Sequence, residues 1–69
     1  MIRLKIKEVA TRQGMSMRKL AKSAGIAYNT LRTLYRDPYR PLNTATLDKL
    51  ARALDVDASE LIETESKKA

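Results

Sequence analysis

The stretch MRKLAKSAGIAYNTLRTLYR, residues 17–36, decides the fold of this chain. Apolar residues recur at helical spacing in both of its halves: Leu20, Ala21, Ala24, Ala27, Leu31 and Leu34. Gly25 stands between the halves, and a glycine there can adopt the left-handed conformation that ends a helix. The spacing therefore predicts two short helices joined by a tight turn.

The residues around the turn are those of a helix-turn-helix. Ala21 faces the angle between the two axes, where a larger side chain would push the helices apart. Ile26 follows Gly25 and can fill that angle with apolar volume. A small residue, a glycine four positions later and apolar residues beyond it are the signature of this motif. The second helix of such a unit normally lies in the major groove of DNA.

The predicted second helix divides into two sides. At roughly 100° per residue, an arc of about 140° carries only side chains with polar groups: Tyr28, Asn29, Arg32, Thr33 and Arg36. The residues expected to face the protein are Ala27, Thr30, Leu31 and Leu34. Amide, guanidinium, hydroxyl and phenol groups can read base edges or hold phosphates, so we predict that the polar arc meets DNA.

Composition restricts the fold and excludes several kinds of site. The 69 residues make one domain, and three Tyr with no Trp or Phe favour an aliphatic helical bundle. Because Cys and His are absent, disulfides, thiol chemistry and the usual zinc ligands are excluded. No apolar run approaches the ~20 residues of a membrane span. We expect a cytoplasmic protein without metal or cofactor.

The net charge of +6 is unevenly distributed. Residues 1–47 hold ten Lys and Arg against two acids, a net charge of +8, whereas residues 48–69 carry −2. An excess of charge can simply keep a small protein soluble. Its confinement to the half with the helix-turn-helix favours a nucleic-acid surface.

The amino terminus has the alternation of a strand. Ile2 and Leu4 share one side of residues 1–7 and are expected to be buried there. A strand needs a partner for its backbone, and the expected partner is the segment 62–65. That pairing would bring together side chains of opposite charge: Arg3, Lys5, Glu63 and Glu65. Pairing with a second subunit is the alternative.

Capping residues and apolar periodicity place the helices. The expected segments are 6–13 with Gly14 after it, 17–23 with Ser16 as N-cap, 27–36, a helix capped by Asn43 that contains Leu47, Leu50, Ala51 and Leu54, and a short helix after Asp57. Residues 64–69 are expected to fray. Arg18 and Lys19 lie in the first turn of their helix, where positive charge opposes the helix dipole. A phosphate docked there would reverse this penalty. The alternative is that both side chains are simply solvated, since they would then destabilise the helix only slightly.

Residues 4–63 resemble the Cro and lambda-repressor-like, or Xre-type, helix-turn-helix family. The matching residues are Ser16, Leu20-Ala21, Gly25-Ile26, Thr30-Leu31, Leu34, the block Leu47 to Val56, and Glu60-Leu61-Ile62. The resemblance implies an all-α, five-helix DNA-binding domain, to which the end patterns add short amino- and carboxyl-terminal strands. We take residues 1–69 as this single domain.

In that family the start of the second motif helix touches bases. The resemblance implies base contacts for Ala27, Tyr28, Asn29, Arg32 and Thr33. Backbone contacts fall to the start of the first motif helix and the loop after the second: Ser16, Met17, Arg36, Tyr39 and Arg40, to which charge adds Arg18, Lys19 and Lys22. Met17 stands where the family usually has Gln, so one hydrogen-bond donor to a phosphate is lost. Ala27 stands where the family usually has a hydroxyl residue, so its contact with a base can only be apolar.

Three classes of function follow. The leading hypothesis is a sequence-specific regulator of double-stranded DNA, a small repressor that acts by occupancy, as a homodimer on half-sites about 34 Å apart. The alternative is a protein-interaction module on the same fold, of the antitoxin or anti-repressor kind, with Tyr28, Tyr35 and Tyr39 as a hot spot. An enzyme is not expected, since without His or Cys the scattered acids form no catalytic pair. No small-molecule ligand is evident.

Overall fold

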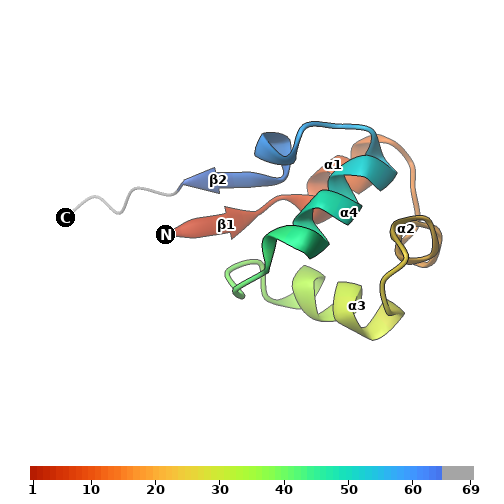
Figure 1. The fold of residues 1–69 in the computed structure, drawn as a ribbon, viewed down its shortest axis with the longest axis horizontal. Coiled ribbons are helices and arrows are strands. Elements are labelled where there is room, and N and C mark those ends of the chain that lie inside the picture. Colours follow the sequence, from red (N-terminus) through yellow and green to blue (C-terminus); the bar gives the residue numbers. More distant parts are fainter. Residues whose placement is uncertain (65–69) are drawn as a thin grey trace.

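The computed structural model describes residues 1–64 and has a mostly helical fold (Figure 1). Within these residues the elements follow in the order β1 (Ile2–Leu4), α1 (Ile6–Arg12), α2 (Met17–Ala24), α3 (Tyr28–Arg36), α4 (Thr44–Leu54), the 3-10 helix η1 (Ala58–Leu61) and β2 (Ile62–Thr64). The helix-turn-helix predicted over residues 17–36 is α2 and α3 with their turn.

The expectation of five α-helices is wrong, because the described residues contain four. The segment after Asp57 is the four-residue 3-10 helix η1, and the Asp57 side chain makes no capping hydrogen bond. The chain becomes extended at Ile62, where it turns to pair with β1, so a longer helix has no room. Thr64, which we expected to belong to a frayed tail, lies in β2. The rest of that expected tail, 65–69, lies outside the described residues.

The two termini pair with each other, as expected for pairing within the chain. β1 and β2 are antiparallel, with Ile2 opposite Thr64 and Arg3 opposite Glu63. Arg3 Nη1 donates to Glu63 Oε1 over 2.7 Å, which confirms one expected ion pair. Glu65 lies outside the described residues. The sequence did not predict that Arg3 also bonds Glu8 of α1.

Only one of the two β1 side chains expected to be buried is buried. Leu4 is 6% exposed, whereas Ile2 is 48% exposed. Figure 1 shows that β1 and β2 extend outward beyond the helices, which agrees with the exposure of Ile2. The Leu4 end is anchored at the helices, where its backbone N–H donates to the Pro38 carbonyl over 2.7 Å.

Capping residues define the ends of α2 and the start of α4 as the sequence predicts. Ser16 Oγ accepts from the Lys19 N–H at the start of α2, and Asn43 Oδ1 accepts from the Thr46 N–H at the start of α4. Gly25 ends α2 in the left-handed conformation at φ 71°. Ala27 is extended and gives no side-chain cap, so α3 begins one residue later than expected.

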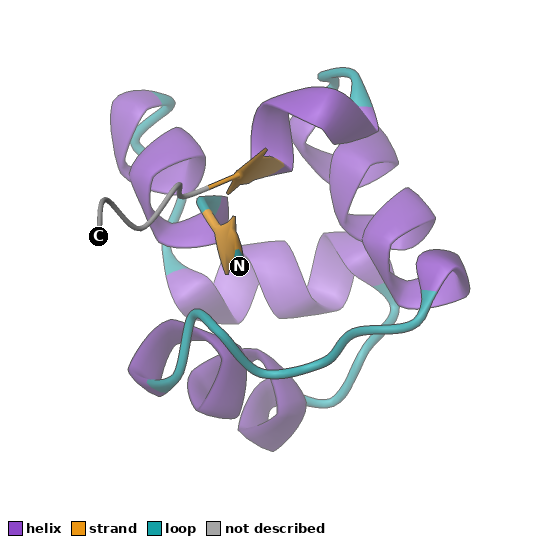
Figure 2. Ribbon diagram, turned by 90° about the vertical axis from the view of Figure 1, so that its left-hand side faces the viewer, coloured by secondary structure: helices purple, strands orange, loops and turns teal. Residues whose placement is uncertain are grey.

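The helices enclose one aliphatic core (Figure 2). Side chains from every helix meet there, among them the almost fully buried Ile6, Val9, Leu20, Leu31, Leu50, Leu54 and Leu61. A polar contact joins the ends of two helices: Gln13 Nε2 donates to the Leu54 carbonyl over 2.6 Å. That bond satisfies a carbonyl in the last turn of α4, which would otherwise lack a partner in its own helix. The core therefore holds α2 and α3 at a fixed angle.

Candidate nucleic-acid interface

The outer side of α3 presents the predicted polar arc. Tyr28, Asn29, Arg32 and Arg36 are exposed, and Thr33 is partly exposed. Leu31 and Leu34 are buried on the opposite side, as predicted. The expectation that Ala27 and Thr30 face the protein is wrong, because both are exposed. Ala27 precedes the helix in extended backbone, and Thr30 borders a surface cleft instead of the core.

The polar groups of α3 differ in what they can still bond. Thr33 Oγ1 donates to the Asn29 carbonyl over 2.9 Å, so this hydroxyl is left with acceptor capacity and a methyl group. No side chain caps the helix at Ala27, and its first backbone N–H groups are therefore open to an external acceptor. The start of α3 thus offers donors where the helix dipole is positive.

The start of α2 lies beside the start of α3. The Arg18 guanidinium carbon is 5.8 Å from the centre of the Tyr28 ring, a cation–π distance that links the two helices. Ser16 uses an oxygen lone pair as cap, and its hydroxyl proton can still be donated. Lys19 and Lys22 are exposed, and the first turn of α2 holds no acid. This end of the molecule therefore attracts anions.

Met17 and the loop after α3 complete the predicted set. The Met17 side chain is partly buried against the core, so only its backbone N–H is suited to a phosphate. In the loop, the Asp37 carbonyl accepts from the Arg40 N–H over 3.1 Å, and Asp37 Oδ1 accepts from the Tyr39 N–H over 3.3 Å. These bonds hold Tyr39 and Arg40, both exposed, just beyond the end of α3.

A cleft lies on each side of α3. The α1–α3 cleft has a volume of about 500 Å³ and is lined by Lys7, Thr11, Met15, Met17, Arg32, Tyr35 and Arg36. The α3–α4 cleft, of about 350 Å³, includes Asn29, Thr33, Arg40 and the α4 cap Asn43 among its lining residues. Four of the five predicted contact residues of α3 are therefore divided between two flanking clefts, and Tyr28 lines neither of them.

Three polar residues that line the α1–α3 cleft are absent from the predicted set: Lys7, Thr11 and Tyr35. Lys7 and Thr11 lie one helical turn apart on α1, a spacing that a sequence reader could have noticed. Nothing in the sequence indicated that this side of α1 borders α3. The pKa of the Tyr35 phenol is raised by partial burial, so the group remains a hydrogen-bond donor at neutral pH.

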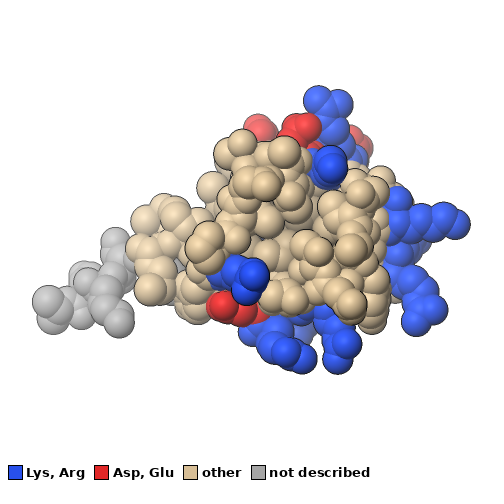
Figure 3. All heavy atoms as spheres, turned by 60° about the horizontal axis from the view of Figure 1, so that its bottom comes forward, with Lys and Arg blue, Asp and Glu red and all other residues tan. Residues whose placement is uncertain are grey.

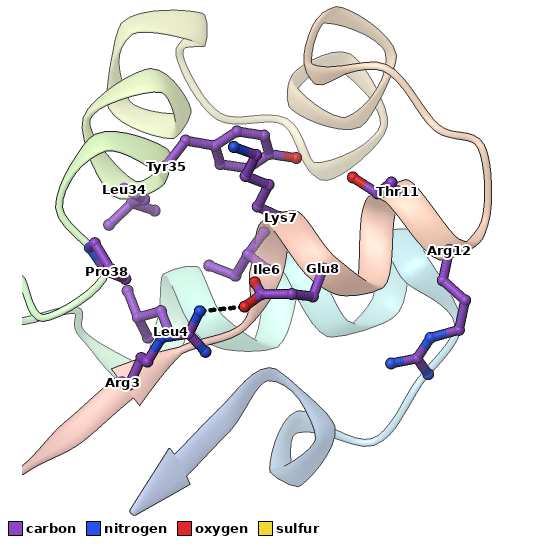
Figure 4. Close-up of a pocket in the computed structure, with 10 residues that line it drawn as sticks. All are labelled: Arg3, Leu4, Ile6, Lys7, Glu8, Thr11, Arg12, Leu34, Tyr35 and Pro38. Carbon is purple, nitrogen blue, oxygen red and sulfur yellow. Dashed lines mark hydrogen bonds and ion pairs between the residues drawn. The ribbon is translucent and has the colours of Figure 1, made fainter. Parts of the chain in front are cut away.

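A larger hollow of about 650 Å³ continues from the same place between β1, α1 and α3 (Figure 4). Its apolar lining comes from Leu4, Ile6, Leu34 and Pro38. The Arg3 guanidinium and the Glu8 carboxylate lie at its edge, and their pairing occupies the charge that a ligand would need. Partial burial raises the Glu8 pKa, but the hydrogen bonds from Arg3 and from the Glu8 backbone, together with the charges of Arg3 and Lys5, outweigh that effect, so the pKa is lowered overall.

The surface charge is gathered as the sequence suggests. Figure 3 shows most of the visible Lys and Arg side chains at the right-hand end and along the lower edge of this face. The right-hand end is where Figure 1 places α2. Most of the visible Asp and Glu side chains lie along the top edge. No helix among the described residues is long and apolar enough to cross a membrane.

Comparison with known proteins confirms the family resemblance. A model of the Cro/C1-type helix-turn-helix DNA-binding domain matches residues 5–67. The chain is also similar to the solution structure of the N-terminal DNA-binding domain of SinR, the master biofilm regulator of Bacillus subtilis. The two share 29% sequence identity over 80% of each chain, with a TM-score of 0.69. No curated protein matches the chain.

Proposed function

Because the chain belongs to the Cro/C1-type helix-turn-helix DNA-binding family, we propose that it is a sequence-specific transcriptional regulator that inserts α3 into the major groove. DNA binding is the common property of that family. The similar SinR domain is described as the DNA-binding domain of a regulator, which supports a regulatory role here. Sequence specificity and the docking of α3 are the steps we add.

The observation that carries the proposal is the position of α3 between two clefts. A B-DNA major groove is about 12 Å wide and is bordered by a phosphate backbone on each side, so it admits one helix with its side chains. With α3 in the groove, its polar arc would face base edges. The outer sides of the two clefts, at Lys7 and Arg36 in one and at Arg40 in the other, would then face the two backbones.

The base contacts follow from the chemistry of the arc. Arg32 is suited to the O6 and N7 acceptors of guanine, and Asn29 to the N6 and N7 edge of adenine. Tyr28 is held beside them by Arg18. Thr33 offers a methyl group and acceptor lone pairs, and Ala27 offers a methyl group, so both suit apolar contact with thymine.

The backbone contacts divide between the two ends of α3. Near its start they would come from Ser16, Met17, Arg18, Lys19 and Lys22, and near its end from Arg36, Tyr39 and Arg40. Charged hydrogen bonds to phosphates fix the register of a protein on DNA without reading its sequence. This arrangement separates positioning from reading, which the variants below can test separately.

We also propose that the chain binds as a homodimer and represses by occupancy. Apolar side chains gather at the end that carries β1: Met1 is 76% exposed, Ile2 48% and Tyr39 44%. These residues line one surface hollow together with Leu42 and Ile62. A two-fold axis at this end would leave both copies of α3 accessible on one side. A dimer bound there would exclude other proteins from the same DNA.

The alternative of a protein-interaction module has less support. Its tyrosine hot spot would require Tyr28, Tyr35 and Tyr39 to form one cluster. Tyr28 begins α3 and Tyr39 lies beyond its other end. The helix between them is about 13 Å long at about 1.5 Å per residue. Tyr35 is partly buried against α1 between them. The three rings therefore offer no common surface of the kind that concentrates binding energy.

Selection of binding sites from random duplexes tests the proposed function. We expect an enriched palindromic sequence with half-site centres one helical turn apart, about 34 Å. Absence of any enriched sequence, with the protein folded, would contradict sequence-specific binding. Enrichment of a single unpaired half-site would contradict the dimer alone.

A further inference from the structure

The α1–α3 cleft contains three polar residues that the predicted contacts leave unused: Lys7, Thr11 and Tyr35. Among the described residues that line it are three cations, Lys7, Arg32 and Arg36, and no carboxylate. Two hydroxyl groups, those of Thr11 and Tyr35, complete the polar part of the lining. Cations and hydroxyl donors without a competing acid are the groups that hold a phosphate.

The side chains from α1 and α3 approach one another across this cleft. Figure 4 shows Lys7 and Thr11 on the same side of α1, turned toward the Tyr35 ring. All three line both the cleft and the larger hollow beside it. The Tyr35 ring packs against the core, so its hydroxyl is held in place by the fold.

Lys7 and Arg3 differ in whether their positive charge is already paired with a carboxylate. The Arg3 guanidinium already bonds Glu8 and Glu63 and cannot serve a further anion without losing a partner. The exposed Lys7 ammonium has no ion pair among the described residues. It is therefore available to a ligand on the α3 side of α1.

We infer that the α1–α3 cleft binds one backbone phosphate of the duplex, held by the Lys7 ammonium and the hydroxyls of Thr11 and Tyr35 beside Arg36. This inference rests on the proposed function, because it places the phosphate along the edge of the groove that α3 occupies. It extends the DNA surface onto α1, beyond the helix-turn-helix itself. The contact adds affinity and register but reads no base.

Two variants isolate the cleft. Tyr35→Phe removes one hydroxyl and keeps the ring, and we expect affinity to fall about tenfold on every duplex, as for one hydrogen bond to a charged oxygen. Lys7→Gln should weaken binding and make the slope of log K against log salt about 0.9 less negative, the value for one phosphate. Lys49→Gln is the control, because it makes the same charge change at an exposed position of α4, and it should change the slope by less than Lys7→Gln does.

Duplexes in which one backbone phosphate is replaced by an uncharged methylphosphonate identify the phosphate that the cleft binds. Single methylphosphonates are placed in turn along the selected duplex, and affinities are measured for the parent chain and for Lys7→Gln. We expect one position per half-site at which the methylphosphonate lowers the affinity of the parent chain but does not further lower the affinity of Lys7→Gln. If no position shows this loss of additivity, or if both cleft variants bind like Lys49→Gln, the inference is wrong while the proposed function stands. Failure of the parent chain to bind any duplex would overturn both.

Discussion

Arg3 and Glu63 are 60 residues apart in the chain and are joined by a hydrogen bond of 2.7 Å between Nη1 and Oε1. The same guanidinium bonds Glu8, so one side chain ties β1 to β2 and to α1. These bonds raise the pKa of Arg3, the bond with Glu8 first and that with Glu63 second. Arg3 thus links both strands to α1 through its side chain.

Removing this attachment should lower stability in a pH-dependent way. The Glu8 pKa is lowered in the folded chain, so its stabilisation is present above about pH 4.3, the ordinary value for Glu, and is lost as pH falls through the folded pKa. Arg3→Gln should therefore lower the melting temperature at pH 7, and the difference from the parent chain should shrink toward pH 3. Thermal melts across this range measure it.

Arg52→Gln is the matched control for that series. Arg52 pairs with Asp48 over 2.9 Å, but its side chain is 80% exposed, and solvent screens such a pair. We expect no measurable change of melting temperature in this variant. An equal loss in both variants at pH 7 would show that Arg3 has no special role.

The two apolar side chains of β1 should respond differently to truncation. Leu4→Ala empties a buried position and should lower the free energy of unfolding by about 2–5 kcal/mol. Ile2 is half exposed, and Ile2→Ala should lower it by about 1 kcal/mol or less. Urea denaturation of the two variants checks this order. Similar losses would show that the outer end of the sheet is covered in solution.

The proposed dimer predicts two chains on each palindromic duplex. Sedimentation equilibrium should give this stoichiometry for the parent chain, and Ile2→Asp should reduce it to independent binding of single chains by placing charge in the apolar end. Ser59→Asp adds the same charge on exposed η1 and should leave two chains bound. A single chain per duplex for the parent protein would refute the dimer.

Binding should depend strongly on salt. Six exposed cations are proposed to contact phosphates: Arg18, Lys19, Lys22, Arg36, Arg40 and, from the α1–α3 cleft, Lys7. If about five to seven phosphates are neutralised, log K should fall against log salt with a slope of roughly −5 to −6. The slope is measured by titrating a labelled duplex at salt concentrations from about 50 to about 200 mM, a range over which counterion release changes the affinity strongly. A nearly flat line would remove DNA as the principal partner.

Local signals in the sequence were enough to predict the motif. Ser16 and Asn43 cap α2 and α4 through bonds to the third following N–H, and Gly25 turns the chain as expected, because caps and turns depend on neighbouring residues. The proximity of Arg3 and Glu63 was also predicted, because alternation and charge favoured pairing of the amino-terminal strand with the segment 62–65, but the register was not.

Contacts that depend on how distant helices pack were not predicted. Gln13 bonds the Leu54 carbonyl 41 residues away. The bond between Arg3 and Glu8 is local, but it depends on the angle between β1 and α1, which the apolar pattern does not give. The exposure of Ile2 required knowing that the helices end before the sheet does. The α1–α3 cleft is of the same kind, because a periodic pattern on α1 does not say which helix lies beside it.

The most direct measurement compares Arg32→Ala with Arg40→Ala on two duplexes at one salt concentration. The duplexes are the selected site and a shuffled sequence of equal length, and circular dichroism confirms that both variants are folded. Arg32→Ala should lose about 1–3 kcal/mol on the selected site and little on the shuffled one, whereas Arg40→Ala should weaken both alike. If Arg32→Ala keeps the affinity and the preference of the parent chain, α3 does not read the DNA through this face.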